Sequence, residues 1–234
     1  MRFLPPLESG VLLRRYKRFL ADVEVAGRGV VTMHCANTGA MLGCDTPGSP
    51  AWFSTSGNPK RKYPQSLELV EVRDGGRVCT VCVNTARPNA IVEEALAAGR
   101  IAELRQGPAR REVPIPGEAG RFDFALGGEA PTFVEVKSVT LCRDGVGAFP
   151  DAVSERARRH VEALARCVAR GSRSVLLFCA PHTGIRRVTV ADDIDPRYGD
   201  AVREAVAAGV EVLAYGCVVT PGEVAIEGPL PLDL

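Results

Sequence analysis

A stretch of twenty residues, 121–140 (RFDFALGGEAPTFVEVKSVT), constrains the fold and the chemistry of this chain more than any other. It predicts two short strands joined by a polar turn at Gly127, because side chains on a strand alternate between its two faces. Asp123 lies on the polar side of the first strand, and Glu135 and Lys137 share a face of the second. If the strands pair as a hairpin, two carboxylates and one ammonium group meet at one place. The apolar side of the first strand consists of Phe122, Phe124 and Leu126.

Two carboxylates beside a lysine are suited to a divalent cation that serves phosphodiester hydrolysis. Such a hard cation, Mg²⁺ or Mn²⁺, is held by oxygen ligands and keeps open positions for water and a phosphate oxygen. Asp123 and Glu135 supply two ligands, and the carbonyl of Val136 supplies a third. An acid from a preceding element, Glu94 or Glu112, completes the shell.

Lys137 has two possible roles. As a catalytic residue together with Asp123 and Glu135, it orients the attacking water or stabilises developing negative charge. In the alternative, Lys137 and Glu135 form a surface ion pair that contributes roughly 0–1 kcal/mol to stability. The spacing of the three residues does not separate these two interpretations.

The first 85 residues read as an all-β unit. Glycine and proline punctuate short apolar runs, and no helical period lasts more than about a turn. Five short strands in this length are typical of a small barrel such as an oligonucleotide-binding (OB) fold. The expected strands lie in residues 11–25, 29–35, 51–56, 67–73 and 77–84.

Positive charge is concentrated at the N-terminal end. Residues 1–63 contain nine Lys/Arg and four acids, a balance of +5, so the remainder nets −4. Two clusters, at 14–19 and 58–63, interleave cations with aromatic rings, as in sites where cations take phosphates and rings stack on bases. In the alternative, Phe19 is a core residue and the cations form a solvated face. The nucleic-acid-binding candidates are Arg14, Arg15, Tyr16, Lys17, Arg18, Lys60, Arg61 and Lys62.

Two polar segments, 34–42 (HCANTGAML) and 84–89 (NTARPN), read as structural loops whose side chains bond the backbone. The second marks a domain boundary, so we expect domains at 1–85 and 86–234, with Asn89 as a helix N-cap.

The second domain alternates helices and strands, which predicts a mixed sheet flanked by helices. The fold class is therefore α/β with an additional all-β part. Ser154 caps a strong helix, on which Arg156 and His160 are expected to face one side and contact DNA, unless that side is simply solvated. The expected elements are a helix at 90–104, a strand at 111–115, the opening hairpin, a helix at 154–171, a doubly buried strand at 174–180, an edge strand at 186–191, a helix from Asp195 and a final strand at 211–220.

The eight cysteines are scattered through apolar segments, and the single C-x-x-C, Cys79 and Cys82, lies on a strand where the two thiols face apart. Buried thiols in a reducing cytosol follow. No run approaches the length of a membrane span and no signal peptide is present, so we expect a cytoplasmic protein without membrane contact.

The hairpin pattern D-x11-E-x-K and the order α-β-β-β-α-β resemble the PD-(D/E)XK nuclease superfamily, although Phe122 stands where the motif name has proline. Longer blocks, among them RYKRFLADV, HCANTGAMLG, NTARPN, RFDFAL and FVEVKSVTL, resemble the sugar fermentation stimulation protein A family along nearly the whole chain. That resemblance implies DNA binding, an OB-like N-terminal domain and a nuclease-like C-terminal domain.

These observations predict a DNA-binding protein with a divalent-metal phosphodiesterase site and without strong sequence preference. The alternative is a non-catalytic DNA-binding regulator of sugar catabolism genes that uses the nuclease-like domain as a scaffold. A third, weaker hypothesis is a fold that binds a small anionic ligand or a protein partner. A homo-oligomer is possible, because the strand at 211–220 is either central or pairs with another copy.

Overall fold

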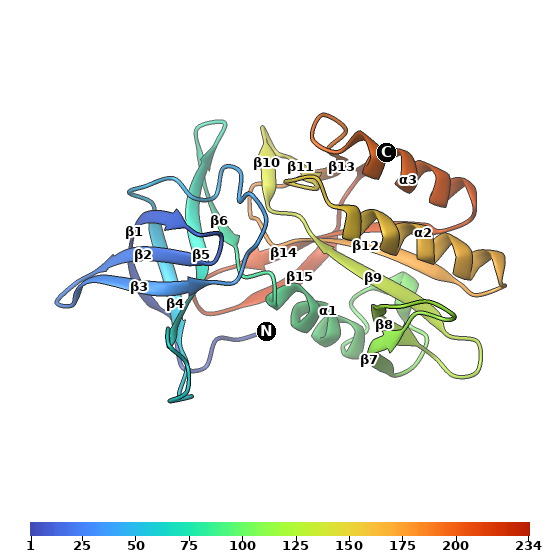
Figure 1. Cartoon of the computed structure of the whole chain (residues 1–234), viewed down its shortest axis with the longest axis horizontal. Helices are drawn as coiled ribbons and strands as arrows, with labels where there is room; N and C mark the ends of the chain where they lie inside the picture. The colour runs from blue at the N-terminus through green and yellow to red at the C-terminus, as the bar shows by residue number, and fades with distance from the viewer.

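The computed structural model describes all 234 residues and contains a β-barrel followed by a larger α/β unit (Figure 1). Five barrel strands form a closed ring, because β3 pairs with β2 on one side and in parallel with β5 on the other, and β6 extends β5 beyond the ring. Closure leaves no free edge and buries alternate side chains inside. The predicted OB-like barrel is confirmed. Its strands are β1 (Glu8–Tyr16), β2 (Leu20–Val25), β3 (Gly29–Cys35), β4 (Pro50–Thr55), β5 (Gln65–Asp74) and β6 (Arg77–Cys82).

The run 11–25, expected as one strand, is two strands that reverse at a turn. Lys17 and Arg18 both have positive φ values, 50° and 64°, which reverse the chain between Tyr16 and Leu20. Hydrophobic periodicity could not show this reversal, because turns of this kind normally carry asparagine or glycine.

The second unit is built on a six-stranded sheet with helices on both faces (Figure 1). Helix α1 packs on one face and α2 and α3 on the other, so the sheet separates two hydrophobic clusters. Every residue of the predicted strand at 174–180, now β12, is buried between two parallel neighbours, β9 and β14. The sheet strands, in spatial order, are β15 (Val224–Pro229), β14 (Glu211–Val219), β12 (Ser174–Ala180), β9 (Thr132–Ser138), β8 (Arg121–Leu126) and β7 (Ala109–Pro114).

A further four-stranded sheet was not predicted as such. Two of its strands lie between the predicted hairpin and α2, where no element was expected. The strand that was expected at an edge is flanked on both sides. The strand at 211–220 is neither final nor at an edge, since β15 pairs with it. The small sheet consists of β10 (Leu141–Arg143), β11 (Val146–Phe149), β13 (Arg187–Val190) and β16 (Leu232–Asp233).

The helices begin largely where capping chemistry allows. Ser154 Oγ accepts from the Ala157 N–H, and Asp195 caps α3 in the same way, as predicted. Asn89 is not an N-cap, because α1 already starts at Arg87 and Asn89 lies in its first turn. The helices are α1 (Arg87–Ala97), α2 (Glu155–Ala169) and α3 (Pro196–Ala207), with a 3₁₀ turn η1 (Ala102–Leu104) after α1.

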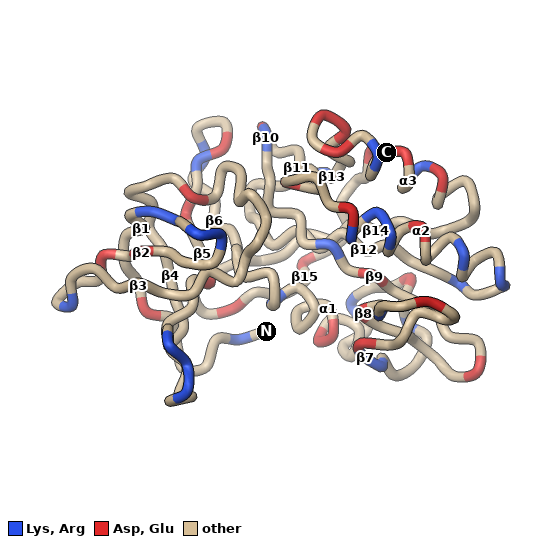
Figure 2. Tube along the Cα trace, viewed as in Figure 1, with Lys and Arg blue, Asp and Glu red and all other residues tan.

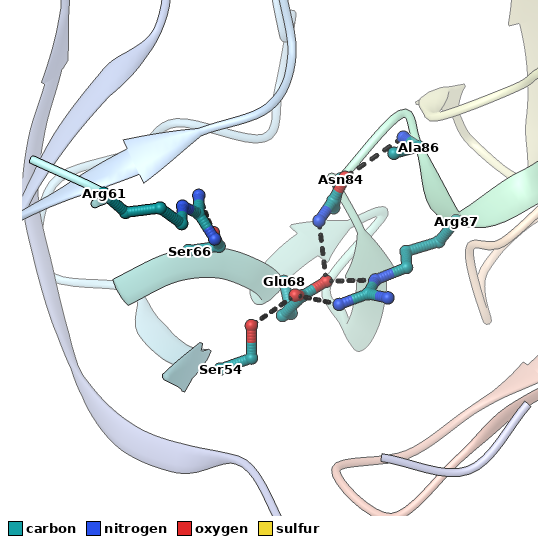
Figure 3. Close-up of polar contacts among 7 residues, drawn as sticks. All are labelled: Ser54, Arg61, Ser66, Glu68, Asn84, Ala86 and Arg87. Carbon is teal, nitrogen blue, oxygen red and sulfur yellow. Dashed lines mark hydrogen bonds and ion pairs between the residues drawn. The ribbon is translucent and has the colours of Figure 1, made fainter. Parts of the chain in front are cut away.

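A buried polar network joins the barrel to α1 (Figure 3). Glu68 on β5 is 0% exposed, and its carboxylate accepts from the Arg87 guanidinium at 2.5 and 2.8 Å. Ser54 and Asn84 donate the two remaining hydrogen bonds, at 2.6 and 2.9 Å. Four donors thus satisfy a carboxylate that has no access to water, and they fix the start of α1 against the barrel.

The chain start also joins the two units. Met1 donates its ammonium to the Val224 carbonyl at 2.6 Å, and Arg2 forms a bridge with Glu223. Phe3 is buried in the α1-side cluster. The first three residues therefore pack with the second unit, which a division of the chain at residue 85 does not describe.

None of the helices is long and apolar enough to cross a membrane. All eight cysteines are free thiols, and only Cys142 is more than slightly exposed.

His182 makes stability depend on pH. It is buried where β6 meets the second unit, and its Nδ1 accepts from the Gly184 N–H at 2.9 Å, so the ring is neutral. Burial lowers the pKa of His182 to about 4, against an opposing effect of Asp74. Between pH 6.5 and 4 the unfolded chain binds a proton that the folded chain does not, so stability falls as pH falls.

We expect acidification from pH 6.5 to 4 to lower the free energy of unfolding by up to about 3 kcal/mol through His182. The measurement is urea unfolding from pH 4 to 8 for the wild type and for His182→Gln. The variant should lose less stability on acidification, and parallel curves would contradict the assignment.

Candidate active site

A cleft of about 580 Å³ opens between the barrel and the second unit. The two segments that were predicted to be structural loops, 34–42 and 84–89, both line this cleft. The first contributes Asn37 and Gly39, and the second contributes Thr85 and Asn89. The hairpin supplies the opposite wall with Asp123, Glu135, Val136, Lys137 and Ser138. The structure therefore brings the predicted carboxylates and lysine together in one concave site.

Asp123 lies where the ladder between β8 and β9 ends. The last regular pair is Phe124 with Val134, and the Asp123 Oδ2 accepts the Val136 N–H at 2.7 Å. Strict alternation fails here, because Phe122 packs on the α2 side while Phe124 packs on the α1 side. The predicted apolar side of this strand is thus wrong at Phe122. The neighbouring strand is irregular too, with Glu112 at a φ of 49°.

Glu135 is buried, with 3% exposure, at the centre of a charged group. Its Oε1 accepts from Lys137 Nζ at 2.5 Å and lies 2.5 Å from His160 Nδ1, which carries the proton of that bond. Its Oε2 has no hydrogen-bond partner. The Glu135–Lys137 pair is therefore not the solvent-exposed ion pair of the alternative interpretation, since both side chains are nearly inaccessible.

The pKa values of the two carboxylates, Asp123 and Glu135, are shifted in opposite directions. Burial raises the pKa of Asp123, and the charge of Glu135 raises it further. Burial also opposes ionisation of Glu135, but the Lys137 ammonium and the His160 hydrogen bond outweigh it and lower the pKa of Glu135. The repulsion between these carboxylates would be relieved by an added cation.

Asn89 is a site residue that the sequence did not identify. Its Nδ2 donates to Asp123 Oδ1 at 2.6 Å, so both Asp123 oxygens are oriented, one from α1 and one from β9. The segment NTARPN carried the signal, because a polar loop that meets a helix start can present an amide to a neighbouring strand. Asn37 has the structural role predicted for its loop, because its side chain accepts a hydrogen bond from the Gly39 N–H and donates one to the Val83 carbonyl.

Of the two acids predicted to complete the metal shell, Glu94 and Glu112, only one lies at the site. Glu94 lies outside the cleft, where its carboxylate pairs with the Met1 ammonium at 2.5 Å, so it is excluded as a ligand of this site. Glu112 does line the cleft. No group of three or more His, Cys, Asp or Glu side chains is gathered as a metal cluster. The acidic core of the site is the pair Asp123 and Glu135.

The first basic cluster divides into bound and free side chains. Arg14 pairs with Asp22 at 2.8 Å and Tyr16 donates to the same carboxylate. Arg15 donates to the carbonyls of the 37–40 loop, so its role is to hold that loop. These three candidates are engaged within the barrel. Lys17 and Arg18 are exposed, and Arg18 lines the cleft.

The other basic candidates divide between a distant loop and the rim of the cleft (Figure 2). Lys60, Arg61 and Lys62 are on the loop between β4 and β5, away from the cleft lining, and Arg61 donates to Ser66 at 3.0 Å. Arg156 is exposed at the rim of the cleft. Contrary to the prediction, His160 does not share the exposed side of α2 with Arg156, because it is buried and its Nδ1 lies against Glu135 Oε1.

Comparison with known proteins agrees with this architecture. Residues 13–83 match the SfsA N-terminal OB domain, and residues 86–223 match the sugar fermentation stimulation protein RE domain. A sugar fermentation stimulation protein homolog of Ectopseudomonas mendocina is 56% identical over 94% of each chain. A homolog of Pseudomonas aeruginosa is 53% identical over the full length of both.

A solved structure has the same fold. "The structure of Pyrococcus Furiosus SfsA in complex with Ca2+" superposes with a TM-score of 0.88 at 24% identity, covering 100% of this chain and 98% of that one. Both units and their order therefore agree with known members, and the chain belongs to the sugar fermentation stimulation protein (SfsA) family.

Proposed function

We propose that this protein is a divalent-metal phosphodiesterase that cleaves nucleic acid, with DNA as its substrate in the cytoplasm. One observation carries the proposal. Glu135 Oε2 is a buried carboxylate oxygen without a partner, beside a second carboxylate in a cleft. An unpaired buried charge is costly, and a bound cation would satisfy it.

The donor set fits a hard cation. Mg²⁺ and Mn²⁺ bind oxygen ligands and retain waters, so one or two carboxylates are enough to hold them. Asp123 and Glu135 would be these ligands, with Glu112 and the Val136 carbonyl at the same wall. The related Pyrococcus SfsA was solved in complex with Ca²⁺, another oxygen-binding cation, which supports this assignment.

The surrounding residues then have defined roles. Mg²⁺ bound at this pair would polarise a phosphodiester and lower the pKa of a bound water. Asn89 and the Val136 N–H hold the Asp123 carboxylate in one orientation. His160 fixes Glu135 Oε1 and leaves Oε2 free. Lys137, within reach of the same carboxylate, stabilises negative charge that develops on the phosphate.

The rim supports a phosphate-backbone substrate. Arg18 and Arg156 line the cleft from opposite units and make no ion pair with an acid. Contacts of this kind bind the backbone and carry little sequence information, which accords with weak sequence preference.

The test is incubation of the intact protein with end-labelled single- and double-stranded oligonucleotides in the presence of Mg²⁺ or Mn²⁺. We expect metal-dependent cleavage that EDTA stops. Both Asp123 oxygens already accept hydrogen bonds within the protein, so a scaffold that binds DNA without cutting is the competing outcome. Binding without cleavage in every condition would establish that alternative and reject a phosphodiesterase.

A further inference from the structure

The turn between β1 and β2 is held in a conformation that its residues disfavour. Lys17 and Arg18 both adopt left-handed φ values, 50° and 64°. Hairpin turns with two such residues favour asparagine and glycine, because a Cβ atom is strained there. The chain therefore places two long cations where smaller residues would make the hairpin more stable.

The side chains of Lys17 and Arg18 have no partner, whereas the nearby Arg15 holds the turn in place. Neither the Lys17 nor the Arg18 side chain forms a hydrogen bond or ion pair, and both are exposed. Arg15 donates one hydrogen bond to the Arg18 carbonyl at 3.0 Å and another to the Gly39 carbonyl at 2.7 Å. A single guanidinium thus ties the turn to the loop that lines the cleft.

The next residue is an exposed aromatic side chain. Phe19 is 47% exposed, whereas Leu20 after it is buried, so the core interpretation of Phe19 is wrong. An aromatic ring beside unpaired cations is the combination that binds single strands, where the bases are free to stack. In a duplex the bases are already stacked and a ring on a turn reaches only the backbone.

A path for a strand continues beyond the carboxylates. A second hollow of about 620 Å³ shares Glu112, Asp123 and Arg156 with the cleft and adds Arg121 and Arg159. Neither Arg121 nor Arg159 has an acidic partner within ion-pair distance. A chain that enters past the barrel turn can therefore remain in contact with cations on both sides of Asp123.

We propose that residues 17–19 form a clamp for single-stranded nucleic acid at the mouth of the cleft. Lys17 and Arg18 contact consecutive phosphates and Phe19 stacks on a base. This inference rests on the proposed function for its purpose, since the clamp delivers a strand to the carboxylates. It concerns binding, so its test is independent of turnover.

The experiment measures affinity for a labelled 20-nucleotide strand and the corresponding duplex in EDTA, a length of a few OB-fold site sizes. The variant Lys17→Asn/Arg18→Gly should weaken single-strand binding about tenfold and reduce the slope of log affinity against log salt by about 1.4. The same variant should melt about 2–4 °C higher, because the strain is relieved. Phe19→Ala should weaken single-strand binding about tenfold and change duplex binding little.

The matched control is Lys60→Ala/Lys62→Ala, which removes the same charge from the other basic loop and should leave affinity nearly unchanged. Unchanged single-strand affinity in Lys17→Asn/Arg18→Gly would overturn the clamp. Equal losses for strand and duplex in Phe19→Ala would reject single-strand recognition. If the wild type binds but never cleaves, the proposed function fails and these binding results still decide the clamp.

Discussion

Replacing Asp123 by asparagine should lower metal-dependent cleavage by roughly 10³-fold, because a ligand that contributes several kcal/mol of charge stabilisation is lost. The amide is nearly isosteric, yet it presents only one oxygen where the carboxylate accepts from both Asn89 and Val136. Affinity for oligonucleotide in EDTA should stay close to that of the wild type, since the phosphate contacts lie on other residues. Single-turnover cleavage at saturating protein separates the two quantities.

Glu94→Gln is the matched control for this substitution. It removes the same charge from an acid that the sequence also nominated as a ligand, but Glu94 pairs with the chain terminus outside the cleft. Cleavage by this variant should equal that of the wild type. If Glu94→Gln were as defective as Asp123→Asn, or if Asp123→Asn cleaved normally, the assignment of the site would be wrong.

The largest stability effect is expected for Arg87→Ala. It removes the bidentate guanidinium from the fully buried Glu68 carboxylate, which keeps only its two neutral donors, Ser54 and Asn84 (Figure 3). Removing one partner of a buried ion pair costs about 3–5 kcal/mol, which lowers the melting temperature by roughly 10 °C in a chain of this length. Calorimetry or denaturant unfolding measures the change.

Arg173→Ala provides the comparison. Arg173 also forms a bidentate pair, with Glu211 at 2.6 Å, but both side chains are partly exposed. Its loss should cost about 1 kcal/mol or less. A double variant, Arg87→Met/Glu68→Leu, should regain much of the stability lost in Arg87→Ala, because no unpaired charge remains buried. Equal effects for Arg87→Ala and Arg173→Ala would show that burial does not set the strength of the Glu68 pair.

Much of this architecture follows from local sequence signals. The uninterrupted apolar run 174–180 predicted the central buried strand, and Ser154 and Asp195 predicted helix starts, because burial and capping depend on nearby residues. Strand alternation and one turn predicted the convergence of Asp123, Glu135 and Lys137, although alternation is broken between Phe122 and Phe124. The family resemblance rested on the same blocks of sequence and is confirmed by the domain matches.

The remaining features depend on contacts between distant segments. Asn89 meets Asp123, and His160 meets Glu135, only because α1 and α2 cover opposite faces of one sheet. The sequence predicted that Arg15 is a cation available to phosphates, but the fold places the loop at 37–40 against its guanidinium. Periodicity reports which face a residue occupies, and it does not report which partner the fold places opposite that face.

The most direct test of the metal-site claim is to locate the metal. Crystals soaked in Mn²⁺ and measured near the manganese absorption edge should show an anomalous difference peak between Asp123 and Glu135, with ligand distances of roughly 2.0–2.3 Å and Glu135 Oε2 as one ligand. The peak should be absent from Asp123→Asn crystals treated in the same way. A wild-type cleft that stays empty at saturating Mn²⁺, or a peak that avoids both carboxylates, would contradict the account.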